Sequence, residues 1–126
     1  MTSTGDADAN LRRAFDLLGE AVARGADIVA LPENFYYLRT DPEKPVPALS
    51  LDSGPVEALR GFAEKNKIHL LAGTIPEEIP GGKKTFNTSM LIMPDGEITA
   101  AYRKIHLFDV DIPDGGACGA VHRESE

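Results

Sequence analysis

Glu33 is the first residue in the chain whose type and place could support chemistry. It follows the apolar run at residues 28–31 after a single proline. In open α/β sheets, ligands bind in the crevice beyond the carboxyl ends of the strands. A carboxylate at the edge of a buried strand is partly desolvated, so it could act as a base near neutral pH. The alternative interpretation is a solvated glutamate at the end of a strand.

Lys104 is the second such residue. It lies in the stretch Tyr-Arg-Lys-Ile-His-Leu-Phe-Asp at residues 102–109, at the end of an expected hairpin strand. A lysine at the mouth of a site can hold a developing oxyanion and orient a carboxylate. The alternative is a surface lysine beside an arginine. If both residues are catalytic, Glu33 and Lys104 should approach each other to about hydrogen-bond or single-water distance at the carboxyl ends of neighbouring strands.

Other residues that often carry chemistry have spacings that argue against it. No two of the three histidines (His69, His106 and His122) have the spacing of a helical zinc pair, and the chain has one cysteine. His69, inside an apolar strand, is expected to be a hydrogen-bonded core residue. Cys118 lies among glycines and alanines that would not lower its pKa, so we expect an incidental thiol. The glycine pairs begin no phosphate-binding loop. We therefore predict no metal and no cofactor.

The elements that would position Glu33 and Lys104 follow from periodicity and from turn residues. The pattern predicts a helix capped by Asp8 or Asn10 and ended by Gly25, then a strand at 28–31 that Pro32 stops and a loop at 39–51. It next predicts a helix starting at Pro55 with Ser53 or Gly54 as cap, and a strand at 68–74. The last elements are a hairpin of strands 85–93 and 98–104 around a turn at 94–97, and a loop beyond Phe108. A helix followed by a continuously apolar strand is typical of a sheet covered by helices. The fold class is therefore α/β.

Composition narrows the class of protein further. The 126 residues carry a net charge of −7, with 42% hydrophobic and 26% charged residues. That is ordinary for a globular domain, and it disfavours nucleic acid and anionic membranes as partners. No apolar run approaches the roughly 20 residues that span a bilayer, and the polar N-terminus does not resemble a signal peptide. One cysteine suits a reducing compartment, so a cytoplasmic protein is expected.

Three blocks of the sequence resemble the nitrilase, or carbon–nitrogen hydrolase, superfamily and its small-amidase (omega-amidase-like) branch. They are residues 25–35, residues 86–89 with 94–96, and residues 102–109. The resemblance implies part of an αββα four-layer sandwich that hydrolyses a non-peptide C–N bond through a Glu-Lys-Cys triad. By the same resemblance Glu33 would be the general base and Lys104 would stabilise the tetrahedral intermediate. Glu124 would be a second, supporting glutamate.

The sequence departs from this family in ways that bear on activity. The family's nucleophile lies in a segment of the type Gly-Ile-Cys-Tyr-Asp, which Cys118 does not match. We therefore expect residues 1–126 to form a partial domain, incomplete at both ends, that lacks the nucleophile and is inactive and marginally stable alone. The full-length form would take a small-molecule amide, and self-association is left open. The alternatives are a non-catalytic fragment that pairs with a full-length relative, or an unrelated ligand-binding α/β domain.

Overall fold

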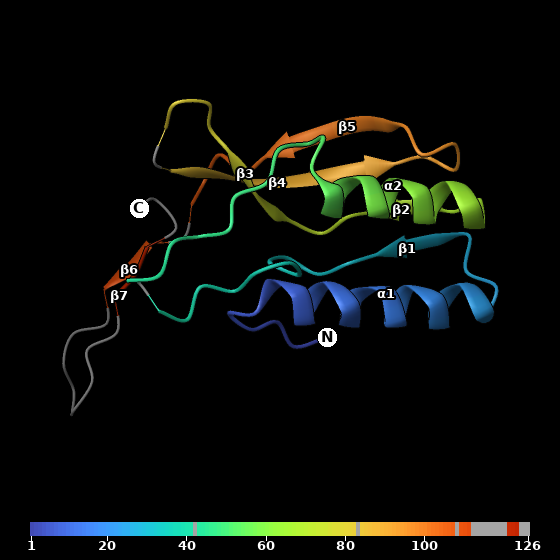
Figure 1. The fold of residues 1–126 in the computed structure, drawn as a ribbon, viewed down its shortest axis with the longest axis horizontal. Helices are drawn as coiled ribbons and strands as arrows, with labels where there is room; N and C mark the ends of the chain where they lie inside the picture. The colour runs from blue at the N-terminus through green and yellow to red at the C-terminus, as the bar shows by residue number, and fades with distance from the viewer. Residues whose placement is uncertain (42, 83, 108, 112–120, 124–126) are drawn as a thin grey trace.

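Two helices and a five-stranded sheet form most of the part of the chain that the structure describes (Figure 1). The structure is a computed structural model that describes residues 1–41, 43–82, 84–107, 109–111 and 121–123. The helices are α1 (Ala7–Ala23) and α2 (Gly54–Asn66). The main sheet contains β1 (Ile28–Ala30), β2 (His69–Leu71), β3 (Ile75–Glu78), β4 (Thr85–Ile92) and β5 (Ile98–Arg103). The expected α/β alternation is confirmed.

Helix α1 begins two residues earlier than the predicted cap allowed. Asp6 is the N-cap, and its side chain accepts a hydrogen bond from the backbone of the first turn. Asp8 is inside the helix, and Asn10 is buried with its amide donating to the carbonyl of Tyr36. The prediction of Asp8 or Asn10 as cap was therefore wrong, because Asn10 instead fixes the later loop. Gly25 has φ +84°, the left-handed conformation expected just beyond the end of this helix.

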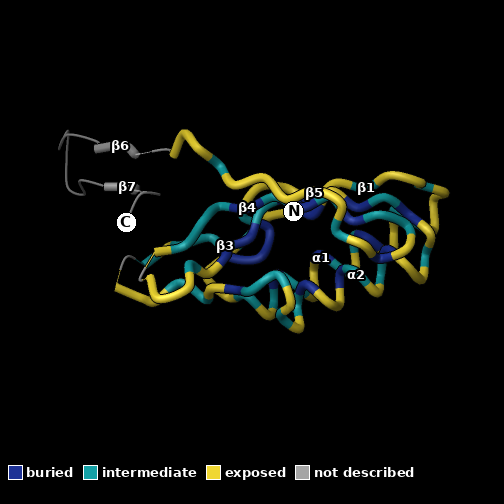
Figure 2. Tube along the Cα trace, turned by 90° about the horizontal axis from the view of Figure 1, so that it is seen from above, coloured by how far each residue is buried: buried dark blue, intermediate teal, exposed yellow. Residues whose placement is uncertain are grey.

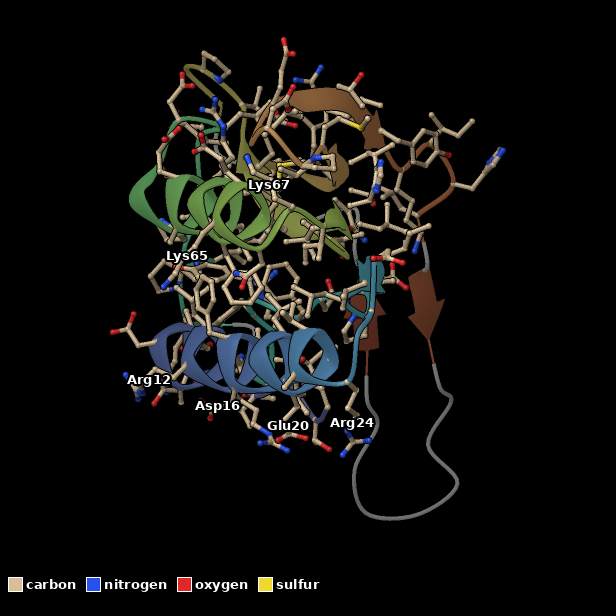
Figure 3. The ribbon with its side chains drawn as sticks, turned by 90° about the vertical axis from the view of Figure 1, so that its right-hand side faces the viewer. Arg12, Asp16, Glu20, Arg24, Lys65 and Lys67 are labelled. Atoms are coloured by element: carbon tan, nitrogen blue, oxygen red, sulfur yellow. The ribbon has the colours of Figure 1, made fainter. Side chains whose placement is uncertain are left out.

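The two helices lie side by side on one face of the sheet, where Phe15 of α1 and Phe62 of α2 have ring centroids 5.7 Å apart. Ser53 is the N-cap residue of α2, as one of the two predicted alternatives had it. Four exposed charged side chains of α1 and its C-cap lie on the side that faces away from α2 (Figure 3): Arg12, Asp16, Glu20 and Arg24. A helix with one apolar and one charged face is the arrangement expected for a covering layer.

The sheet is mixed, and its order places β2 and β3 along one edge of β4 and β5 along the other. Strands β1 and β2 are parallel, while β4 is antiparallel to its three neighbours. The predicted hairpin of β4 and β5 is confirmed, and Gly96 in its turn has φ +82°. Strand β3 was not predicted, because Pro76 and two glutamates obscure its alternation.

The prediction of continuous loop beyond Phe108 was also wrong. Strands β6 (Asp109–Asp111) and β7 (Val121–Arg123) pair antiparallel in a separate two-stranded sheet. Three-residue strands are too short to show a period of two, so only backbone pairing reveals them.

The core lies between the helices and the sheet (Figure 2). Leu18 of α1, Leu59 of α2, Leu70 of β2 and Met90 of β4 are each at most 1% exposed. The opposite side of the sheet, here called the open face, carries the alternate residues of each strand. They include Ile28, Ala30, His69, Leu71, Pro76, Glu78, Asn87, Ser89, Leu91, Ala100 and Tyr102. The described residues leave much of this face accessible.

Candidate active site

Glu33 reaches its position because the chain leaves β1 and crosses over the end of β2. The N–H of Leu31 donates to the carbonyl of Leu71 at 2.9 Å, which is the last bond of this ladder before the crossing. A Cβ on Gly73 would stand 2.0 Å from the carbonyl oxygen of Pro32, and Gly73 has φ +34°. Only glycine permits this close approach of two backbones. The crossing therefore brings Glu33 from β1, at one edge of the sheet, to Asn87 of β4.

The residues after Glu33 hold the crossing in place. Asn34 has φ +54°, and its N–H donates to the hydroxyl of Thr74 at 2.8 Å. Phe35, next in the chain, is fully buried in the core. A residue between two anchored neighbours loses little further freedom when its side chain binds something, which suits a catalytic group.

Lys104 lies on the opposite edge of the sheet from β1, directly after the last residue of β5. Its N–H donates to the carbonyl of Asn87 at 2.9 Å, and its side chain points to the open face. The Nζ atom lies 3.1 Å from Oε1 of Glu33. Asn87 donates from Nδ2 to the same carboxylate oxygen at 3.0 Å. Two donors from separate parts of the sequence, Asn87 and Lys104, therefore converge on one oxygen of Glu33.

The Glu33 carboxylate is held in its charged form. The hydrogen bond from Lys104 lowers the pKa of Glu33 and is the largest influence on it, desolvation raises this pKa, and a hydrogen bond from Asn87 lowers it further. The side chain is 51% exposed, so burial is modest. The expectation of a carboxylate tuned by desolvation toward neutral pH was wrong for this arrangement, because the neighbouring ammonium has the larger effect.

The predicted approach of Glu33 and Lys104 is confirmed in distance but not in strand order. Strands β1 and β5 are not neighbours, because β2 and β4 lie between them. Glu33 and Lys104 therefore meet only because the chain after Leu31 crosses toward β4. Asn87 was quoted in the sequence only as part of a similar block, and no role was predicted for it. Its place in β4 opposite the end of β5 is visible only once the register is known.

The other predicted residues divide into two groups. Glu124 and Cys118 lie outside the described residues, so the role of Glu124 and the inertness of Cys118 stay predictions. His69 lies on the open face and is partly exposed, which differs from the core position expected for it. Among the described residues, no group of three or more potential ligands is placed to hold a metal ion.

The site thus places a carboxylate and an ammonium, two groups that acid–base chemistry can use, at the edge where ligands bind in α/β sheets. The sequence profile named Carbon-nitrogen hydrolase matches residues 1–123. The chain belongs to the carbon–nitrogen hydrolase family.

Named relatives place this family membership more finely. The chain is 40% identical over 116 residues to a deaminated glutathione amidase of Synechocystis, covering 91% of this chain and 43% of that protein. It is 43% identical over 107 residues to the omega-amidase NIT2 of Xenopus tropicalis, covering 82% of this chain and 37% of that protein. The resemblance to the small-amidase branch is confirmed. The chain spans less than half the length of these relatives.

Solved structures agree on the fold. The NitFhit protein of C. elegans superposes with a TM-score of 0.80 at 30% identity, covering 98% of this chain and 30% of that one. Nit3 of Saccharomyces cerevisiae, a member of the nitrilase superfamily, gives 0.68 at 33% identity, covering 83% and 41%. The helix and sheet layers described here are thus part of the nitrilase-like α/β sandwich, as predicted. No helix among the described residues is long and apolar enough to cross a membrane.

Proposed function

We propose that the protein containing residues 1–126 hydrolyses the C–N bond of a small amide, with Glu33 as general base and Lys104 as the cation that holds the tetrahedral intermediate. The observation that carries this proposal is the convergence of Lys104 and Asn87 on one oxygen of Glu33, at 3.1 and 3.0 Å. A base held by two donors stays oriented, and an ammonium beside it is preorganised for an oxyanion.

The reaction follows from these two groups and a thiol. A cysteine outside residues 1–126 attacks the amide carbon while the Glu33 carboxylate takes the thiol proton. Lys104 holds the negative oxygen of the tetrahedral intermediate. The intermediate collapses as Glu33 returns the proton to the leaving nitrogen, which departs as ammonia. Water, deprotonated by Glu33, then attacks the thioester carbonyl, and the acid is released as Glu33 returns the proton to the departing thiolate. This scheme gives Cys118 no role and assigns Glu124 a role in supporting the general base.

The proposed substrate class is a small ω-amide. Its support is that the relatives matching this chain include a deaminated glutathione amidase and omega-amidases. Asn87 and Lys104 also present hydrogen-bond donors on the open face, and such donors suit a carbonyl or a carboxylate. A cytoplasmic location, no requirement for a cofactor and self-association of the full-length form remain predictions.

A second candidate function is that of an interaction module that pairs with a full-length relative. The open face favours it, since Ile28 is 72% exposed, Leu71 43% and Tyr102 60%. Exposed apolar residues gathered on one sheet face often mark a surface that binds protein. This candidate requires no turnover by any form of the chain.

The test is a chimera in which residues 1–123 replace the matching part of the Synechocystis deaminated glutathione amidase. Ammonia release from succinamate, a simple ω-amide, is measured. Glu33→Gln should lower the rate by about 10²–10⁴-fold because the proton acceptor is lost. Lys104→Met should lower it by about 10²–10³-fold because the oxyanion loses its cation. Glu57→Gln and Lys65→Met, which alter charged residues of α2, are the matched controls and should leave the rate unchanged.

The outcomes separate the two candidates. A folded chimera without turnover, or one whose rate survives both site substitutions, contradicts the hydrolase proposal. The interaction module instead predicts that the unmodified chain co-sediments with the full-length amidase, and that Ile28→Lys on the open face abolishes the complex. Absence of a complex in analytical ultracentrifugation would exclude this second candidate.

A further inference from the structure

A second charged cluster lies on the helix-facing side of the sheet, opposite the Glu33–Lys104 site. Glu77 of β3 accepts hydrogen bonds from the hydroxyl of Thr88 at 2.7 Å and from Arg103 Nε at 2.8 Å and Nη2 at 2.6 Å. The guanidinium carbon of Arg103 lies 4.7 Å from the centroid of the Phe86 ring. The proposed reaction uses none of these four side chains.

The cluster crosses three adjacent strands. Glu77 stands opposite Phe86 in the β3–β4 register, and Thr88 stands opposite Arg103 in the β4–β5 register. The Arg103 side chain therefore passes over β4 to reach the carboxylate on β3. Two parallel N–H···O bonds of this kind fix both the distance and the orientation of the two groups. The end of β5 is therefore held to β3 by the Arg103–Glu77 ion pair and to β4 by backbone hydrogen bonds.

The Glu77 carboxylate is buried and charged in its contact with Arg103 and Thr88. Its side chain is only 7% exposed, and a buried carboxylate is tolerated where it is paired and hydrogen-bonded. The hydrogen bonds from Arg103, followed by that from Thr88, outweigh desolvation and lower the pKa of Glu77. The carboxylate therefore stays charged and paired throughout the neutral range.

The Arg103–Glu77 ion pair lies immediately before Lys104 in the chain. Arg103 is the last residue of β5, and the next backbone bond, from the N–H of Lys104 to the carbonyl of Asn87, comes at the point where the strand stops. The residues beyond it are exposed, with Ile105 at 73%. Because side chains alternate along a strand, a shift of one residue here would turn Lys104 away from Glu33. The site thus depends on what holds this strand end in register.

We propose that Glu77 and Arg103 are positioning residues that hold Lys104 against Glu33 by fixing the end of β5 from the opposite side of the sheet. This inference rests on the proposed function, which gives Lys104 its part in the reaction. It adds a requirement that the reaction scheme does not contain: an ion pair that never touches the substrate sets the distance between the base and its cation.

The test uses two readouts on the isotope-labelled protein. One is hydrogen exchange at the Lys104 amide, and the other is the pKa of the Glu33 carboxyl from ¹³C NMR titration. Glu77→Gln removes the charge but keeps the shape. It should speed exchange at Lys104 by about tenfold or more beyond any change at Leu70, because charge-assisted bonds are lost. The Glu33 pKa should rise toward its ordinary value. Glu57→Gln, which breaks the Glu57–Arg60 ion pair on α2, is the matched control and should change neither readout.

Arg103→Lys is the second variant, and it keeps the charge but cannot form two parallel bonds. It should give intermediate values, and it carries the same test if Glu77→Gln does not fold. A merely stabilising ion pair would speed exchange equally at Lys104 and Leu70 and leave the Glu33 pKa unchanged, which would overturn the inference. An ordinary Glu33 pKa in the unmodified protein would instead remove the Glu33–Lys104 pairing that the proposed function needs. The two failures are therefore distinguishable.

Discussion

Replacing Gly73 by alanine should destabilise the protein because two backbones approach each other at this residue. The added Cβ would lie 2.0 Å from the carbonyl oxygen of Pro32, about 1 Å inside the 3.0 Å that such contacts allow, and the residue has φ +34°. The left-handed conformation costs a non-glycine residue about 1–2 kcal/mol, and overpacking costs about 1–3 kcal/mol more. We expect a loss of about 2–5 kcal/mol in the free energy of unfolding. This is a large part of the stability of an ordinary domain.

The assay is urea denaturation of Gly73→Ala beside a control that has the backbone strain without the overlap. Gly25 has φ +84° and no heavy atom within 4 Å of an added Cβ. Gly25→Ala should therefore lose only about 1–2 kcal/mol. The difference between the two variants measures the clash between the crossing chain and β2. If Gly73→Ala is no less stable than Gly25→Ala, the argument that glycine is required at this crossing is refuted.

Three further predictions concern helix stability, acid stability and the site. Gly61→Ala, at an exposed position of α2 with nothing within 4 Å, should stabilise the protein by about 0.5–1 kcal/mol in the same urea assay. The lowered pKa of Glu77 contributes stability that is complete above the unfolded value of about 4.3 and is lost as the pH falls through the folded value, so Glu77→Gln should flatten the acid limb of a stability–pH curve. Asn87→Ala should raise the pKa of Glu33, and by less than removal of Lys104 does, in a ¹³C titration.

The sequence predicted the site residues from chemistry and block similarity, and it predicted the elements from periodicity. The two helices and the β4–β5 hairpin are confirmed, since their apolar spacing and turn signals are local; the cap of α1 was missed because Asn10 bonds to a distant loop. Strand β3 escaped prediction because Pro76 and the buried Glu77 break the apolar pattern, although both fit an antiparallel strand. Burial of Glu77 depends on Arg103, which is 26 residues away in the chain. No local pattern reports a partner at that separation.

The electrostatics of the site could not be predicted for the same reason. In the sequence, Glu33 is a carboxylate beside an apolar strand, and this context predicts a pKa raised by desolvation. The structure adds Asn87 of β4 and Lys104, which directly follows β5. Both reach Glu33 because the chain after β1 passes close to Gly73 at the end of β2. The direction of the Glu33 pKa change therefore depends on the β4–β5 register and on the close approach of Gly73 to Pro32. Neither can be predicted from neighbouring residues in the sequence.

The most direct test of the Glu33–Lys104 pair is the pKa of Glu33 measured by ¹³C NMR in the unmodified protein and in Lys104→Met. The hydrogen bond from Lys104 is the largest influence on this carboxyl, and desolvation acts against it. We predict a pKa below the ordinary glutamate value in the unmodified protein and a clear rise in Lys104→Met, because desolvation then remains with only Asn87 to oppose it. An unchanged Glu33 pKa in Lys104→Met would contradict the pairing on which the proposed hydrolysis depends.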